Sequence, residues 1–124
     1  MTITDQISER TRTIAALNDA ARAKLAHSTI QNYLSNEELI ITRGVAARGW
    51  SFIERALTSV REFADFTPEN DPYHEHDFAA FDFDGVRLNW KIDCYDRALK
   101  WGPQDPADPA QTRRVLTILL AEEY

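Results

Sequence analysis

The sequence contains very little cysteine. Cys94 is the single cysteine among 124 residues, so the fold cannot depend on internal disulfides. Disulfides are rare in the reducing cytoplasm, and a chain of this length can bury a core without them. The start of the sequence lacks the basic and then apolar pattern of a signal peptide, and no apolar run is long enough to span a membrane. We therefore expect a single domain over 1–124 that is soluble and cytoplasmic, with no membrane partner.

The familiar catalytic signatures are also missing. The sequence has four glycines, and none of them forms a phosphate-binding loop or a nucleophile elbow. No arrangement of Ser, His and Asp typical of a hydrolase is present either. These absences favour a non-enzymatic protein that needs no cofactor.

Positive charge is scarce in the middle of the chain. The net charge is −6 overall, but residues 62–108 carry 12 Asp and Glu against 4 Lys and Arg, a difference of −8. An acidic field repels nucleic acid and attracts basic protein surfaces. We expect no direct binding of nucleic acid by this region.

The strongest structural signal is Asp84-Gly85, which lies between two runs that alternate apolar and polar residues. A type I′ turn needs positive φ at both central positions, and Asp-Gly satisfies this need. After the turn, Leu88, Trp90 and Ile92 fall on one face, as in a half-buried antiparallel strand. The pattern predicts a β-hairpin over 77–95.

The remaining elements follow from hydrophobic periodicity. It predicts helices over 4–26 and 51–64, and a strand over 37–43 that is rich in β-branched residues. In the first helix, Asp19 and Arg22 fall on the face expected to be solvated. Asp108 and Pro109 favour a C-terminal helix over 109–122, with a buried strand as the alternative. The fold class is α+β: a small antiparallel sheet of about three strands with a central β-hairpin, packed by about three helices.

Several motifs carry a resemblance to a known family. They are ALNDAAR (16–22), TRGVAA (42–47), FTPENDPYHEHDFAAF (66–81), WKIDCYD (90–96), DPADP (105–109) and RVLTILLAEEY (114–124). In this order they resemble the domain of unknown function 3768 family, small proteins found mainly in alphaproteobacteria. The resemblance implies no assigned activity, but it implies a setting on plasmids, prophages and other mobile elements. His74 and Ala79 stand where the family pattern has Gly, and Cys94 where it has Tyr, so a mechanism that requires His74 would not be a family property.

The segment His74-Glu75-His76-Asp77 suggests a metal site. Two imidazoles two residues apart on an extended segment point the same way, and Asp77 or Asp71 could add a third ligand for zinc or non-haem iron. The alternative, which we favour, is that His76 and Asp77 hydrogen-bond the loop to the sheet while His74 is exposed. We therefore expect no metal site, with His74, His76 and Asp77 as a weak alternative set of ligands.

Other candidate groups have simpler explanations. A carboxylate pair for acid–base chemistry could come from Glu75, Asp77, Asp93 and Asp96, although surface carboxylates at a strand edge are more common. Cys94 lies in the apolar register and is interpreted as a core residue. The tryptophans are interpreted as packing residues; they are Trp50, Trp90 and Trp101.

The acidic middle of the chain gives the leading functional hypothesis. A rigid acidic patch with an aromatic neighbour can dock on a basic protein groove, where matched charge speeds association. The candidate partner-binding residues are Glu69, Asp71, Tyr73, Glu75, Asp82 and Asp84. We expect a non-enzymatic protein-binding module that inhibits or modulates a nucleic-acid-targeting complex, such as a CRISPR effector or a restriction enzyme subunit. The alternatives are an ordinary solubilising surface, a metal-dependent enzyme, and a homodimeric structural accessory protein.

Overall fold

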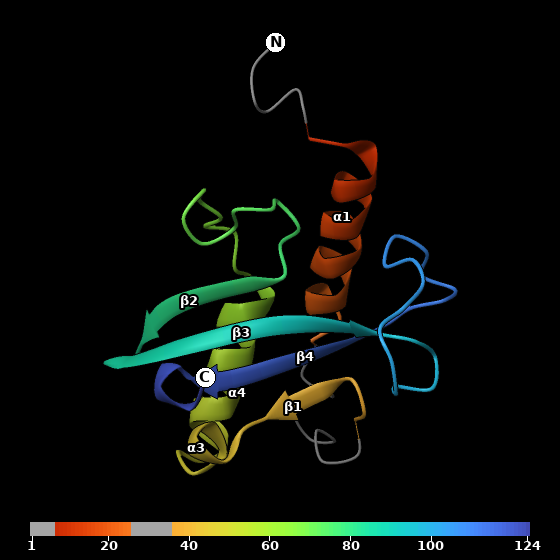
Figure 1. The fold of residues 1–124 in the computed structure, drawn as a ribbon. Helices are drawn as coiled ribbons and strands as arrows, with labels where there is room; N and C mark the ends of the chain where they lie inside the picture. The colour runs from red at the N-terminus through yellow and green to blue at the C-terminus, as the bar shows by residue number, and fades with distance from the viewer. Residues whose placement is uncertain (1–6, 26–35) are drawn as a thin grey trace.

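The computed structural model describes residues 7–25 and 36–124, and its centre is a four-stranded sheet in the order β1-β4-β3-β2 (Figure 1). β3 (Val86–Tyr95) pairs antiparallel with both β2 (Phe78–Phe83) and β4 (Arg113–Leu120). β1 (Leu39–Ile41) runs parallel to β4. The α+β class is confirmed, but the sheet is mixed and has four strands.

The predicted hairpin is confirmed. β2 and β3 are joined by Asp84 and Gly85, whose φ angles are 52° and 75°. Both angles are positive, as a two-residue type I′ connection requires. Phe83 pairs with Val86 directly beside the turn, so the local turn signal also sets the register of the hairpin.

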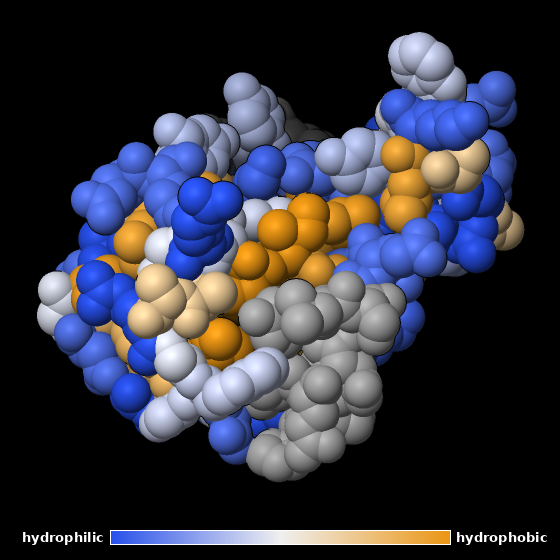
Figure 2. Space-filling model, turned by 90° about the horizontal axis from the view of Figure 1, so that it is seen from below, coloured by the Kyte–Doolittle hydropathy of each residue, from blue (hydrophilic) through white to orange (hydrophobic). Residues whose placement is uncertain are grey.

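The helices gather on one face of the sheet (Figure 1). α1 (Glu9–Ala23) and α4 (Trp50–Arg61) lie against it, and the short α3 (Arg43–Ala46) precedes α4. α1 and α4 lie within the predicted ranges to within a few residues, except that residues 4–6 and 26 are outside the described part of the chain. The core under these helices includes Leu57, Val60, Leu88, Trp90 and Ile118. In the view from below, hydrophobic residues form a strip bordered by hydrophilic ones (Figure 2).

The C-terminal prediction is wrong in its preferred form. Residues 113–120 are the strand β4, followed by the 3₁₀ turn η3 (Ala121–Glu123), and not a helix over 109–122. Asp108 does cap a local turn, since its Oδ1 accepts a hydrogen bond from Ala110 N at 2.9 Å, but that turn ends before the strand begins. β4 lies between β1 and β3, and its last seven residues are buried. Pairing on both sides therefore outweighs the helix-start signal.

Across the described ranges, none of the helices has the length and apolar character needed to cross a bilayer.

Candidate functional site: the loop before the hairpin and its polar base

The segment 67–77 connects α4 to the hairpin, and its own side chains fix its shape. Asn70 N donates to Thr67 Oγ1 at 3.2 Å, and Asn70 Oδ1 accepts from Thr67 N at 2.9 Å. Asp71 accepts from His76 N through Oδ1 at 3.1 Å and from His74 N through its carbonyl at 3.1 Å. Asp71 is only 4% exposed. It was predicted to bind a partner, but its position makes it a loop-closing residue that no partner can reach.

His76 attaches this loop to α1. Its Nδ1 lies 2.9 Å from Asp19 Oδ1, and its Nε2 lies 3.5 Å from Asp71 Oδ2. The imidazole stacks on Phe66 with ring centroids 3.9 Å apart. Asp77 joins the loop to the sheet, because its carbonyl accepts from Ile92 N at 2.8 Å. Asp77 thus holds the loop to the sheet, as the structural alternative proposed, whereas His76 holds it to α1 and not to the sheet.

α1 carries two buried polar residues, of which Asn18 contacts the loop and Arg22 contacts the end of α4. Asn18 Nδ2 donates to the Glu75 carbonyl at 2.8 Å, and Asn18 Oδ1 accepts from Arg114 Nε at 2.7 Å. Arg22 donates to the carbonyls of Val60 and Phe63, at 2.9 and 2.7 Å, near the end of α4. Arg22 is 4% exposed, so its assignment to a solvated face is wrong.

Sequence reasoning missed Asn18, Arg22 and Arg114 as parts of this site. A signal for the first two was present: with Ile14 they recur at intervals of four, which places them on the buried stripe of the helix. No comparable local signal existed for Arg114, because its partners are distant in sequence.

A second polar contact joins the 42–47 motif to the C-terminus. The Glu123 carboxylate accepts from Thr42 Oγ1 at 2.6 Å, from Gly44 N at 3.0 Å and from Leu120 N at 2.8 Å. The Thr42 hydrogen bond is the main cause of a lowered pKa for Glu123. A Cβ at Gly44 would lie 2.6 Å from Leu120 Cδ1 and 2.8 Å from the Glu123 carboxylate, so these side-chain ends would have to move to admit it.

The six predicted partner-binding residues do not form one surface. Asp82 and Asp84 lie at the far end of β2 and are paired with Arg87 at 3.1 Å and Arg55 at 2.6 Å. Glu69, Tyr73 and Glu75 lie on the loop at the other end, about 20 Å away for a six-residue strand. On that loop, Tyr73 is 78% exposed, and Glu69 and His74 are exposed beside it.

Two carboxyls behind the loop tip hold their protons more tightly than usual. Burial raises the pKa of Glu75 and of Asp77. Repulsion from Asp77 adds to the effect at Glu75, and repulsion from Asp71 and Asp93 adds to it at Asp77. The other proposed carboxylates are engaged separately: Asp93 pairs with Lys91 at 2.9 Å, and Asp96 accepts from Lys100 N at 3.1 Å. A shared acid–base pair of Asp93 and Asp96 is therefore not supported.

The remaining candidates have different surroundings. No group of three or more His, Cys, Asp or Glu side chains in 7–25 and 36–124 is arranged to hold a metal ion. Cys94 is half-buried, and burial raises the pKa of its thiol, as for a structural cysteine. Trp90 is fully buried, as predicted, whereas Trp50 and Trp101 are 57% and 74% exposed and are not core residues.

Comparison with known proteins identifies a family. The family described as "Protein of unknown function (DUF3768)" matches residues 41–123, which include the loop, the hairpin and β4. No curated protein and no solved structure matches the chain.

Proposed function

The chain belongs to the DUF3768 family, a family of unknown function, and from the geometry of its loop we propose that it is a protein-binding module that docks through Tyr73 and its neighbours. The observation that carries the proposal is a large exposed aromatic side chain on a loop that buried groups hold in one conformation. Tyr73 is 78% exposed, while Asp71 two residues earlier is 4% exposed. Tyrosine is among the residues that contribute most to interface energy.

The loop is suited to docking because it is already ordered before a partner binds. The hydrogen bonds from Asn18, His74 and His76 fix the backbone on both sides of the tip. A partner therefore does not have to order the loop, and less of the interaction energy is lost on binding.

The expected partner has a basic surface. Residues 62–77 contain six acidic residues and no Lys or Arg, and Glu69 is exposed near Tyr73. Such a surface attracts the same proteins that bind polyanions. Together with the mobile-element setting that the family resemblance implies, this charge leads us to propose a nucleic-acid-targeting defence complex as the partner, so that the protein would act in the manner of an anti-CRISPR or anti-restriction inhibitor.

The test begins with capture of partners from the native host by tagged protein, followed by affinity measurements with the purified partner. Tyr73→Ala is expected to weaken binding at least tenfold, because a hot-spot residue contributes more than about 1.4 kcal/mol. The matched control is Tyr124→Ala, since Tyr124 is 77% exposed and lies outside the loop. Its affinity should stay within about twofold of the wild type.

The same assay separates the loop from the hairpin. Charge reversal with Asp82→Lys and Asp84→Lys tests the far end of β2, and Glu69→Lys tests the loop. The proposal predicts a loss with Glu69→Lys and little change with the hairpin pair. If Tyr73→Ala and Tyr124→Ala bind equally well, the loop is not the docking site and the proposal fails.

A further inference from the structure

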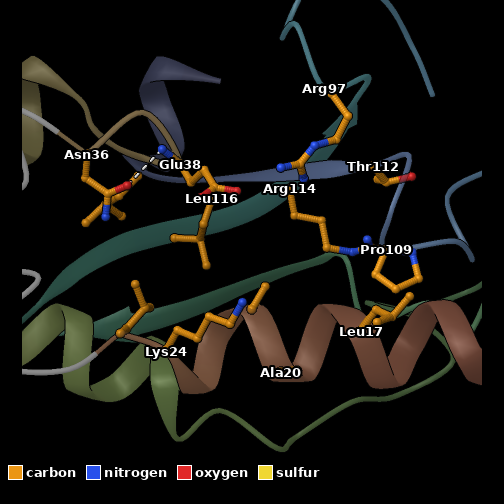
Figure 3. Close-up of a pocket in the computed structure, with 13 residues that line it drawn as sticks. Leu17, Ala20, Lys24, Asn36, Glu38, Arg97, Pro109, Thr112, Arg114 and Leu116 are labelled. Carbon is orange, nitrogen blue, oxygen red and sulfur yellow. Dashed lines mark hydrogen bonds between the residues drawn. The ribbon is translucent and has the colours of Figure 1, made fainter.

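A pocket lies between α1 and the sheet, on the side of β1 and β4 (Figure 3). Its volume is about 260 Å³. Its apolar walls come from Leu17 and Ala20 on α1 and from Leu39 and Leu116 on the sheet. For comparison, an apolar cavity of about 150 Å³ can hold a benzene molecule. The pocket therefore has room for an organic molecule with a short aliphatic chain or two fused rings.

Arg114 brings a buried positive charge to this pocket. It is 9% exposed, and among the described residues it donates hydrogen bonds to neutral acceptors, Asn18 Oδ1 and the Pro106 carbonyl. No carboxylate in the described ranges forms an ion pair with it. A buried guanidinium without a counter-charge is costly, so a bound anion would be stabilised there.

The Arg97 guanidinium is a second positive charge at the same end of the pocket. Arg97 is exposed and lines the pocket, and it forms no hydrogen bond or ion pair with any described residue. Figure 3 shows the Arg97 and Arg114 side chains on the Pro109 side of the pocket, with the Lys24 side chain extending along α1 below them. Among the described lining residues the one that is acidic is Glu38, whose carboxylate lies 3.8 Å from Arg113 Nε. The pocket thus combines apolar walls with excess positive charge.

We propose that this pocket binds a small organic carboxylate with an apolar body. The carboxylate lies between Arg97 and the free side of the Arg114 guanidinium, whose fork geometry matches a carboxylate. The apolar body lies against Leu17, Ala20 and Leu116. This site is separate from the Tyr73 loop, and its existence does not depend on the proposed docking function.

The probes for the test are octanoate and 2-naphthoate, titrated into the full-length protein by calorimetry. Their neutral counterparts, 1-octanol and 2-naphthalenemethanol, have nearly the same apolar body without the charge. We expect binding of at least one acid and at least tenfold weaker binding of its alcohol. Arg97→Gln should weaken binding of the carboxylate about tenfold, since hydrogen bonds to charged groups contribute strongly to affinity. Arg87→Gln is the control, because Arg87 is an exposed arginine at the other end of β3.

A second pair of variants tests the position of the ligand. Ala20→Phe places a ring in the pocket and should abolish binding, whereas Ala16→Phe adds the same ring one turn away on α1, at an exposed position outside the lining. Circular dichroism verifies that both variants fold. The proposal is overturned if neither acid binds at 10 mM, if acids and alcohols bind alike, or if Ala20→Phe and Ala16→Phe have the same affinity.

Discussion

Replacing Arg22 by Met tests whether the buried side of α1 holds the molecule together. Met keeps an unbranched apolar stem but removes the charge and all five donors. The Arg22 guanidinium donates to Val60 O at 2.9 Å, to Phe63 O at 2.7 Å and to Asp19 Oδ1 at 2.9 Å, and it lies 4.8 Å from the Trp90 ring centroid. The substitution therefore removes the Arg22 hydrogen bonds between α1 and the end of α4, while that of Arg61 to the Leu25 carbonyl stays.

The expected loss can be worked out from these contacts. The Val60 carbonyl keeps a backbone partner in Glu62 N, whereas no other described donor reaches the Phe63 carbonyl. Hydrogen bonds from a charged group contribute about 1.5–3 kcal/mol each, and two of these bonds go to backbone carbonyls, so the loss is about 3–5 kcal/mol. With about 2.1 cal/mol/K of unfolding entropy per residue, a chain of this size has roughly 0.26 kcal/mol/K, so a loss of about 4 kcal/mol lowers the Tm by about 15 °C.

Urea denaturation and thermal melting, both followed by circular dichroism, measure this loss. The control is Arg12→Met on the same helix, because Arg12 is exposed and forms no interaction with the described residues. Its free energy of unfolding should change by less than about 0.5 kcal/mol. A change below about 1 kcal/mol for Arg22→Met would refute the reasoning.

Three further changes test the other contacts. Gly44→Ala places a Cβ 2.6 Å from Leu120 Cδ1 and should lower stability by about 1–3 kcal/mol in urea denaturation. Glu123→Gln should lower stability by about 1 kcal/mol at pH 7 and have little effect at pH 3, because the pKa of Glu123 is lowered in the folded state and its contribution is lost as the pH falls. The double variant Glu75→Gln with Asp77→Asn tests a pH dependence of stability in the opposite direction. Their folded-state pKa values are raised, so the native state binds more protons just above the ordinary values of 4.5 and 3.8, and stability falls as the pH rises through that window. In melting curves from pH 3 to 8, the double variant should lose this fall.

The elements that could be predicted are those whose signal is local. Asp84-Gly85 specifies its turn through φ angles that depend only on the two residues. The alternation after it depends on nearest neighbours, and β3 follows it from Val86 to Tyr95. α4 could also be predicted, since its apolar residues have a regular helical spacing.

The errors concern residues whose state is decided by distant partners. β4 is a strand because it pairs with β1 and β3 on its two sides. The sequence of residues 113–120 does not indicate that these two neighbours are there. Arg22 was placed in solvent because an arginine is almost never fully buried unless it is paired. Its partners, the carbonyls of Val60 and Phe63, are backbone groups about 40 residues away that carry no sequence signal.

The same distinction separates two roles among the loop residues. Asp71, His76 and Asp77 are engaged with the backbone or with α1, so a change at any of them alters the loop itself. The side chains of Tyr73 and His74 are exposed and form no such contacts with the described residues. An acidic residue type alone therefore does not identify a docking residue, because Asp71 and Glu69 are both acidic residues but Asp71 is buried.

The backbone of His74 gives this distinction a direct test. Its φ is 61°, in the left-handed region that costs a residue other than glycine about 1–2 kcal/mol. Glycine is the residue that adopts this conformation without strain. His74→Gly should therefore leave the free energy of unfolding unchanged or raise it by up to about 1 kcal/mol. If His74 contributes to docking, the same variant weakens partner binding while stability is kept. A marked loss of stability would instead assign His74 a structural role and remove it from the docking surface.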